Sequence, residues 1–299
     1  MKKISIIIPT HNRKNYLNNI LNQILSQRLD FFSIYGYEVV IIVIIDGSID
    51  GTIEMIDSSF PEIIKILGNG DWWYTKSINE GIIKAIKIFS EYVLLLNDDV
   101  EIHKNYLINL FKAVKGTKSD AIIGSLSLTY EPPHRIYFSG VKKINWWTYK
   151  TVRYDRVYTV YNPQIHKGLR TSIKLTGRGL LIPTKIFQLI GYFDEKFPQY
   201  GSDEEFCLCA RKHGFDILID CDSIIYSHLE QTGKGSLLLK QNLKSLTHSF
   251  FNKYSPNYLM NNLRIQWRYG KVIVIPFTFL RVIFAYFINY FKRSFTKTI

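Results

Sequence analysis

The sequence predicts an α/β fold with a mostly parallel central sheet, and two patterns along the chain support this. Short apolar runs rich in β-branched residues fit strands that are buried on both faces, as in parallel sheets. Stretches with helical periodicity separate these runs, and strands that alternate with helices are typical of α/β domains. We expect strands at residues 4–8, 38–45, 63–67, 92–96 and 121–128.

The stretches between the runs have apolar residues at helical spacing. They predict helices at residues 16–27, 52–58, 75–89 and 105–114. Two further helices are expected at residues 180–191 and 203–213, the second ending at Gly214 as a glycine C-cap. Residues 132–171 are irregular and rich in Tyr and Trp, so we expect an inserted or mobile segment that covers the site.

Polar residues follow three of the predicted strands. They are Pro9-Thr10-His11-Asn12 after the first, Asp46-Gly47-Ser48 after the second, and Asn97-Asp98-Asp99 after the fourth. Ligands of open α/β sheets bind outside the carboxyl ends of the strands. The three groups therefore predict one binding site.

Several carboxylates along the chain are suited to bind a divalent cation or to act as a general base. Asp98 and Asp99 could divide the work between a ribose hydroxyl and Mg²⁺ or Mn²⁺, although a solvated acidic turn is the plainer alternative. Asp203 lies at the start of the predicted helix 203–213, where the helix dipole favours a charged carboxylate. Such a group can act as a base or simply cap the helix. His228 follows an apolar stretch and could ligate metal or have a structural role.

The chain has 299 residues and three cysteines, Cys207, Cys209 and Cys221. This set matches neither a disulfide framework nor a zinc site, so free thiols in a reducing compartment are expected. The first apolar run is too short for the core of a signal peptide, which argues against export of the protein. We therefore expect a cytoplasmic protein.

Positive charge is concentrated at the end of the chain. The formal net charge is +13, and residues 231–299 contain eleven Lys or Arg and no Asp or Glu. Subtracting eleven from thirteen leaves only +2 for the first 230 residues. This asymmetry predicts an acidic partner for the tail, either anionic lipid or nucleic acid.

Residues 271–291 form a long apolar segment within this tail. The segment approaches the ~20 residues needed to span a bilayer, but Pro276, Arg281 and Asn289 interrupt it. Aromatic residues with flanking basic residues favour a helix lying in the membrane interface, and a helix packed on the domain is the alternative. Nucleic acid binding is disfavoured because it would leave the apolar run exposed. We expect a peripheral protein on the inner face of the cell membrane.

Six sequence blocks carry a resemblance that covers roughly residues 4–235. The chain resembles family 2 of the inverting glycosyltransferases, whose catalytic domain has the nucleotide-sugar-binding GT-A fold. Residues 68–75, with Asn79 and Gly81, are similar to a stretch in bacterial cell-surface rhamnosyltransferase-like members. The other blocks are Ile6-Ile7-Ile8-Pro9-Thr10-His11-Asn12-Arg13, Asp46-Gly47-Ser48-Ile49-Asp50-Gly51-Thr52, Leu95-Leu96-Asn97-Asp98-Asp99-Val100, Gly177-Arg178-Gly179-Leu180-Leu181-Ile182-Pro183, and residues 191–206 with Asp203-Glu204-Glu205.

The resemblance implies a role for each matching position. Asp203 would deprotonate an acceptor hydroxyl, and Asp99 with His228 would bind Mn²⁺ or Mg²⁺. The nucleotide would contact Pro9, Thr10, His11, Asn12, Asp46, Asn79, Asn97 and Asp98. The implied donor is a nucleotide-diphosphate sugar, and the expected acceptor is a glycan or a lipid-linked oligosaccharide used in cell-surface polysaccharide synthesis.

The expected organisation is a catalytic domain at residues 1–235 and a basic helical extension at 236–299. The nucleotide half would cover about residues 1–100 and the acceptor half about 101–235. Two positions depart from the family pattern, because Ile45 stands where an Asp is usual and Ser202 where a Glu is usual. Two alternatives remain: a catalytically silent, glycan-binding or scaffolding subunit, which Ile45 favours, and a transferase that loads sugar onto polyprenyl phosphate.

Overall fold

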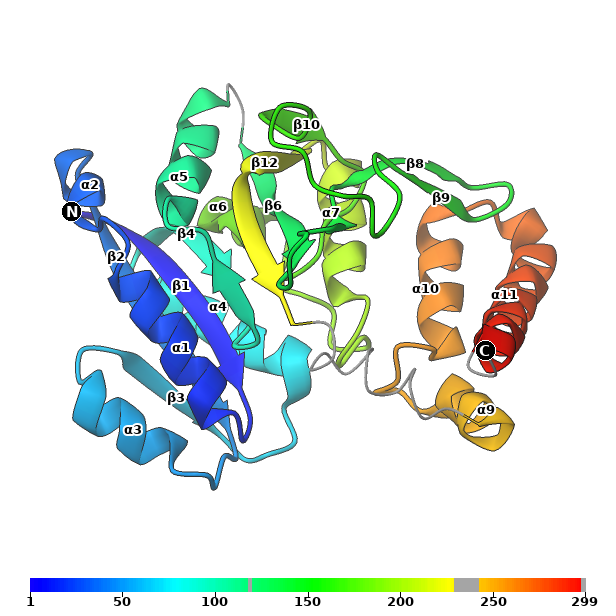
Figure 1. The fold of residues 1–299 in the computed structure, drawn as a ribbon, viewed down its shortest axis with the longest axis horizontal. Helices are drawn as coiled ribbons and strands as arrows, with labels where there is room; N and C mark the ends of the chain where they lie inside the picture. The colour runs from blue at the N-terminus through cyan, green and yellow to red at the C-terminus, as the bar shows by residue number, and fades with distance from the viewer. Residues whose placement is uncertain (118–119, 229–241, 297–299) are drawn as a thin grey trace.

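The computed structural model describes residues 1–117, 120–228 and 242–296. A ten-stranded sheet forms the centre of this part of the chain (Figure 1). Its main path runs in the order β10-β12-β6-β11-β4-β1-β2-β3, while β5 pairs with β12 and β7 pairs with β6. The strands are β1 (Lys2–Thr10), β2 (Tyr37–Asp46), β3 (Ile64–Gly68), β4 (Ser90–Leu95), β5 (Val100–Ile102), β6 (Ala121–Thr129), β7 (Ile136–Phe138), β10 (Leu169–Thr171), β11 (Leu180–Pro183) and β12 (Asp216–Ser227).

The direction of the strands confirms the predicted mostly parallel α/β sheet. Neighbouring strands β3, β2, β1 and β4 pair in parallel, and so do β6 and β12. Strand β11 lies antiparallel between β4 and β6, so β6 points the same way as β4. The carboxyl ends of β1, β2 and β4 consequently lie side by side at one edge of the sheet.

Helices cover both faces of the sheet, and the alternation of side chains on its strands explains why. On β1, Ile6 and Ile8 belong to one core cluster and Ile7 belongs to the other, because successive side chains point to opposite faces. The first cluster also contains residues of α1 (Lys14–Leu25), α2 (Asp30–Ile34), α3 (Thr52–Ser59) and α5 (Tyr106–Gly116). The second contains residues of α4 (Trp73–Lys87), α6 (Thr184–Ile190) and α7 (Ser202–Lys212).

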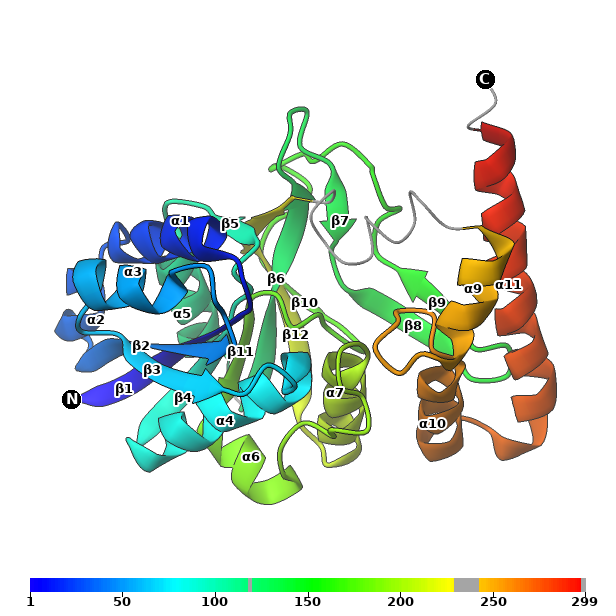
Figure 2. The same ribbon diagram turned by 90° about the horizontal axis from the view of Figure 1, so that it is seen from below.

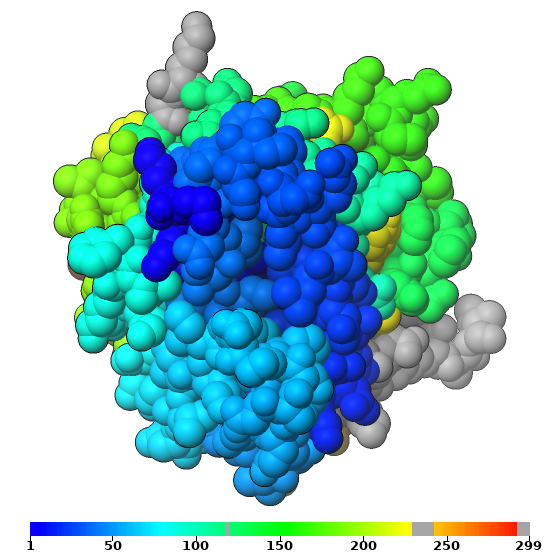
Figure 3. Space-filling model, turned by 90° about the vertical axis from the view of Figure 1, so that its left-hand side faces the viewer, coloured from blue at the N-terminus to red at the C-terminus, as the bar shows by residue number. Residues whose placement is uncertain are grey.

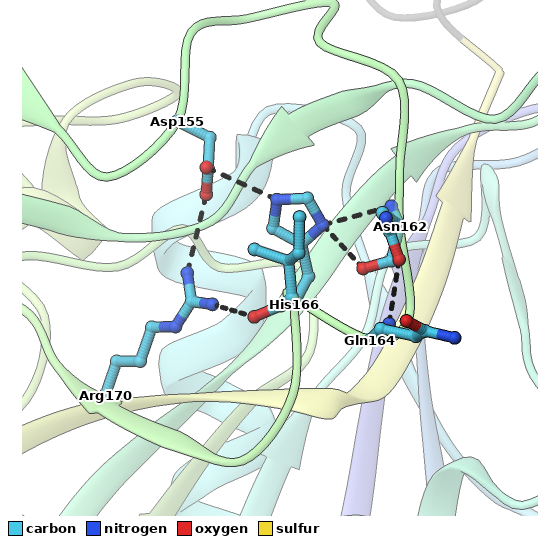
Figure 4. Close-up of polar contacts among 6 residues, drawn as sticks. Asp155, Asn162, Gln164, His166 and Arg170 are labelled. Atoms are coloured by element: carbon cyan, nitrogen blue, oxygen red, sulfur yellow. Dashed lines mark hydrogen bonds and ion pairs between the residues drawn. The ribbon is translucent and has the colours of Figure 1, made fainter.

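The segment predicted to be irregular, residues 132–171, contains regular structure. Besides β7, it forms a two-stranded antiparallel sheet from β8 (Val141–Asn145) and β9 (Lys150–Arg153). A polar cluster around the buried His166 holds the chain that follows (Figure 4). His166 Nε2 lies 3.3 Å from Asp155, and Arg170 donates to the carbonyl of Ile165 at 2.8 Å. These contacts give the segment a defined path.

The C-terminal segment packs against the end of the molecule opposite α1–α3 (Figures 1 and 2). It consists of α9 (Leu243–Phe251), α10 (Leu259–Tyr269), the 3₁₀ turn η2 (Val272–Val274) and α11 (Ile275–Thr296). Arg268 of α10 pairs with Asp194 at 2.6 Å and Glu205 at 2.7 Å, which ties this segment to α7. Figure 3 looks at the other end, where residues of the N-terminal third form most of the surface.

The segment at residues 180–191 and the expected domain boundary are two places where the expected boundaries were not confirmed. Residues 180–191 were expected to be one helix, but the structure forms β11 at Leu180–Pro183 before α6 begins. The four residues of β11 are buried between β4 and β6, and a short run that is apolar on every side fits strand and helix equally well. The domain boundary expected at residue 235 lies outside the described residues.

Candidate active site

The first and fourth strand ends are joined by hydrogen bonds between side chains. The hydroxyl of Thr10 donates to Asp98 at 2.8 Å. Arg13, just beyond β1, donates through one nitrogen to Asp98 at 3.0 Å and to Asp99 at 3.1 Å. Both carboxylates are buried, so this guanidinium compensates charge that water reaches poorly.

The loop after β1 is also joined to the loop after β2. The backbone amide of Asn12 donates to the Ser48 hydroxyl at 2.9 Å, and the Asn12 side chain accepts from the amide of Ile49 at 2.8 Å. His11 Nδ1 contacts the carbonyl oxygen of Asp46. The structure therefore brings Thr10, His11, Asn12 and Asp98 together, as the strand order requires.

Asp46 uses its carboxylate to hold the loop that leads into α4. One oxygen accepts from the backbone amide of Gly70 at 2.7 Å, and the other accepts from those of Trp72 and Trp73 at 2.9 and 3.0 Å. Asp46 was predicted to contact the nucleotide, but both oxygens of its carboxylate are engaged by the protein's own backbone. The preceding Ile45 is buried in the core, so it presents no polar group there.

The two aspartates after β4 differ in their surroundings. Burial raises the pKa of Asp98 to about 6; Arg13 opposes this rise and the neighbouring Asp99 adds to it. Both oxygens of Asp98 have partners, in Thr10 and Arg13. The Oδ2 of Asp99 accepts from Arg13, whereas its buried Oδ1 has no hydrogen-bond partner among the described residues.

Three buried polar atoms near this point lack partners among the described residues. They are Asp99 Oδ1, Asn97 Oδ1 and the hydroxyl of Tyr74. Buried polar groups in folded proteins are nearly always hydrogen-bonded, since an unpaired one costs about 1–3 kcal/mol. Two acceptors and one hydroxyl group left in this state indicate a place that binds a polar ligand.

Asp203 occupies the first turn of α7 on the other side of this place. Its Oδ2 accepts from the backbone amide of Gly177 at 2.9 Å and its Oδ1 accepts from that of Glu204 at 3.0 Å, so the carboxylate is held in one orientation. The next two acids have other partners, since Glu204 pairs with Lys174 and Glu205 with Arg268. The residue before, Ser202, is buried and accepts a hydrogen bond from Thr75 at 2.9 Å.

Tyr74 connects the two acidic groups. Its hydroxyl is fully buried, which raises its pKa well above the usual value; Asp203 and Asp99 both add to the rise and Arg178 opposes it. The hydroxyl also packs against Gly177, because a Cβ atom at that glycine would lie 2.0 Å from it. Asp99 and Asp203 are therefore both within electrostatic reach of a single hydroxyl group, although the first follows β4 and the second lies at the start of α7.

His228 and Asp99 lie at neighbouring strand ends. In the antiparallel pair of β5 and β12, Val100 is opposite Ser227, so Asp99 and His228 each stand one residue beyond the last pair. The imidazole Nε2 of His228 is 2.9 Å from Glu101, and its ring packs 4.2 Å from that of Tyr130. Within residues 1–117, 120–228 and 242–296, no cluster of three or more His, Cys, Asp or Glu side chains is placed to hold a metal.

Two further predicted residues have different positions. Asn79 is buried on α4, where its amide nitrogen donates to the carbonyl of Phe193 and its oxygen accepts from the amide of the same residue. Through these bonds Asn79 connects α4 to the chain that precedes α7, away from the strand ends. Pro9 is the penultimate residue of β1 and is half-buried.

Sequence reasoning gave no role to four residues that line this site. Arg13 and Tyr74 make the contacts described above. Arg178 lies over the ring of Tyr137 at 5.9 Å and reaches the hydroxyl of Ser227 at 3.5 Å. Burial raises the pKa of the Tyr200 hydroxyl, which lies within electrostatic reach of Arg178, Arg13 and Asp99. Arg178 and Arg13 were present in the matched blocks, but nothing local marked their side chains as neighbours.

Comparison with known proteins identifies the family. The sequence pattern described as glycosyl transferase family 2 matches residues 5–172, which is more than half of the chain. The chain belongs to this family. The match includes β1, β2 and β4 with the residues that follow them.

A curated protein has a similar sequence. Glycosyltransferase GlyA of Streptococcus pneumoniae serotype 4 is 23% identical over 204 residues. The alignment covers 67% of this chain but only 27% of GlyA, so the chain spans about a quarter of that relative.

Solved structures share the fold at low sequence identity. S. aureus TarS 1-349 in complex with UDP has a TM-score of 0.55 and 15% identity, with 100% of this chain and 92% of TarS 1-349 covered. GalNAc-T7 with UDP, GalNAc and Mn²⁺ has a TM-score of 0.61 and 14% identity, with 95% of this chain and 58% of the other covered. The family 2 fold of this chain is thus GT-A-like, as the sequence blocks predicted.

Proposed function

We propose that this family 2 glycosyltransferase moves a sugar from a nucleotide-diphosphate donor to a hydroxyl of a glycan acceptor, with inversion at the anomeric carbon. The observation that carries the proposal is the position of Gly177, which packs against the buried hydroxyl of Tyr74 and donates its amide to Asp203, while Asp99 lies within electrostatic reach of the same hydroxyl. A donor held beside Asp99 would present its sugar toward Asp203. Unpaired acceptor atoms of Asn97 and Asp99 give such a donor its polar contacts.

Asp203 is the proposed general base. It takes the proton of the acceptor hydroxyl while the oxygen forms a bond to the anomeric carbon. The bond between that carbon and the diphosphate breaks on the opposite face, and the nucleoside diphosphate leaves with the electron pair. The two backbone amides that bind Asp203 hold its carboxylate in place for this transfer.

Asp99 and His228 are the proposed ligands of Mn²⁺ or Mg²⁺. Asp99 offers its unpaired Oδ1, and the pairing of β5 with β12 brings His228 to the adjacent strand end. An oxygen and a nitrogen ligand at this place fit such a cation. When bound, the cation offsets the charge that develops on the leaving diphosphate. Arg13 keeps Asp98 and Asp99 in position, and Asp98 is the proposed partner of the ribose.

Uridine diphosphate sugars are the first donors to test. The solved structures with this fold include TarS in complex with UDP and with UDP-GlcNAc, and GalNAc-T7 with UDP and Mn²⁺. The resemblance to rhamnosyltransferase-like enzymes makes deoxythymidine diphosphate the second. The proposed acceptor is a lipid-linked oligosaccharide, because the C-terminal segment of this chain carries an exposed apolar surface.

Thermal unfolding with a panel of nucleoside diphosphates, each with and without Mn²⁺, tests the donor site. A ligand that binds only the folded protein raises its melting temperature, so one nucleotide should stabilise the protein more strongly with metal present. The same nucleotide should lose its metal dependence in Asp99→Ala. Stabilisation without any metal effect would contradict the assignment of Asp99.

A second candidate is a catalytically silent subunit that binds glycans. It is favoured by the second strand end, where Ile45 is buried and the carboxylate of Asp46 is occupied by backbone amides. Neither residue offers a free carboxylate to a nucleotide base. Absence of a response to every nucleotide, together with binding of an oligosaccharide, would favour this candidate over transfer.

A further inference from the structure

Helix α11 has two apolar faces, and the residues that the structure describes cover only one of them. The inner face includes the buried Val282, and its neighbours pack on α9 and α10 at Leu246, Phe250 and Leu259. The other face carries a line of side chains at intervals of three or four residues, which is the spacing of one helix stripe. These are Ile273 in the preceding turn η2 and then Phe277, Leu280, Phe284, Ile288 and Phe291 of α11, and they are between 46% and 80% exposed. We call this set the outer stripe.

The polar residues of this segment are turned away from the outer stripe. Arg281 donates to the backbone carbonyl of Tyr149, in the turn between β8 and β9, at 2.9 Å. The buried Thr278 bonds to Gln266 of α10 and to the carbonyl of Val274. The arginine that seemed costly for a membrane helix thus supports the packing of α11 on the protein. The outer stripe keeps an uncharged surface along the helix.

Length and composition alone would allow the segment Val272–Phe291 to cross a membrane. Its packing argues for a different arrangement. One side of α11 lies along α9 and α10, and exposed polar residues of α9 such as Lys244 belong to the same small bundle. A helix held in this way can enter lipid with its outer stripe only, to the depth of about 5–10 Å that interfacial helices reach.

The charge around α11 identifies the surface that would cover the stripe. Residues 231–299 contain eleven basic and no acidic residues. Arg268 and Arg281 are used inside the protein, whereas Lys244, Lys253 and Lys271 are exposed. A second copy would place equal positive charge against this one, which is repulsive. Anionic lipid is attracted by the same lysines.

The tip of the β8–β9 hairpin adds an aromatic residue beside the start of the stripe. The ammonium group of Lys271 lies 4.6 Å from the centre of the Trp147 ring, and Trp147 is 59% exposed. Tryptophan prefers the boundary between lipid and water, and lysine prefers the headgroups. From these observations we propose that the outer stripe of α11, with Trp147 and Lys271, binds the surface of an anionic bilayer while α11 lies in its plane.

Sedimentation with vesicles tests this proposal. The full-length protein should bind vesicles of phosphatidylcholine and phosphatidylglycerol, bind phosphatidylcholine alone more weakly, and lose part of its binding in high salt. The double variant Phe277→Gln/Phe284→Gln should reduce the partition coefficient by about tenfold or more, because two exposed aromatic rings no longer enter lipid. Phe89→Gln/Leu189→Gln removes two side chains that are 90% and 69% exposed outside the stripe, and it should bind as the wild type does.

Three outcomes would overturn the proposal. The first is equal vesicle binding by the wild type and Phe277→Gln/Phe284→Gln. If the circular dichroism spectrum of that variant is altered, the second pair Leu280→Gln/Ile288→Gln takes its place in the same comparison. The second is a wild-type dimer in sedimentation without lipid that the stripe variant dissociates, which would make a second copy the occupant. The third is resistance to alkaline carbonate extraction from membranes, which would indicate a spanning helix. Monomeric protein that carbonate releases supports the proposal.

Discussion

The hydroxyl of Tyr74 and the α-carbon of Gly177 are in direct contact across the site. A Cβ atom at residue 177 would lie 2.0 Å from that hydroxyl and 3.0 Å from the ring carbon that bears it. The amide of the same glycine donates to Asp203 at 2.9 Å. A single backbone position therefore sets both the tyrosine and the proposed base, so its substitution should disturb the two together.

Gly177→Ala should destabilise the protein by about 1–3 kcal/mol, the usual cost of an added group in a packed site. Tyr74→Phe removes a buried hydroxyl without a described partner, so it should leave stability unchanged or raise it by about 1 kcal/mol. The double variant should recover part of the loss, giving a coupling energy in a double-mutant cycle of urea unfolding. Gly116→Ala is the matched control, because nothing lies within 4 Å of its added carbon. Strict additivity would disprove the contact.

Asp46→Ala tests whether this carboxylate anchors a loop or contacts the nucleotide. It removes the acceptor for the amides of Gly70, Trp72 and Trp73, so we expect a loss of about 2–4 kcal/mol in the free energy of unfolding. Asp71→Ala, which removes a neighbouring carboxylate bound to the exposed indole of Trp73, should change it far less. A normal free energy of unfolding with weakened nucleotide binding would instead favour a direct contact with the base.

The strands were predictable because each is a continuous apolar run, and β1, β2 and β4 appear close to the expected positions. Residues 180–183 were misassigned because Leu180, Leu181 and Ile182 are buried on all sides, which removes the periodicity that separates strand from helix. Pairing with β4 and β6, far away in sequence, decides the conformation there.

The site was predictable in its location more than in its contacts. Polar groups after three parallel strands had to converge once the strands were neighbours. The contact of Arg13 with Asp98 spans 85 residues, and that of Tyr74 with Gln199 spans 125, so no local pattern reports either. The bonds that occupy Asp46 and Asn79 depend on loops whose paths are set by packing.

The raised pKa of Asp98 predicts a pH-dependent stability. Its pKa is about 6 in the folded protein, above the usual value of about 4 for an unfolded chain. Between these two values the folded protein binds more protons, so its stability should fall as pH rises through this window and then level off. A shift of about two units corresponds to about 3 kcal/mol. Urea unfolding at about pH 3.5 and about pH 7.5, which lie on either side of this window, should show this loss in the wild type and not in Asp98→Asn.

Asp203→Asn and Glu204→Gln separate the proposed base from its acidic neighbour. Asparagine keeps the shape but cannot accept a proton, so transfer should fall by about 10²–10⁴-fold while the donor still raises the melting temperature. Glu204 pairs with Lys174 instead of facing Gly177, and Glu204→Gln should retain most of the activity. Single-turnover transfer to an acceptor, with donor binding measured in parallel, distinguishes these outcomes. Equal losses in both variants would point to disruption of α7, and full activity in Asp203→Asn would remove it as the base.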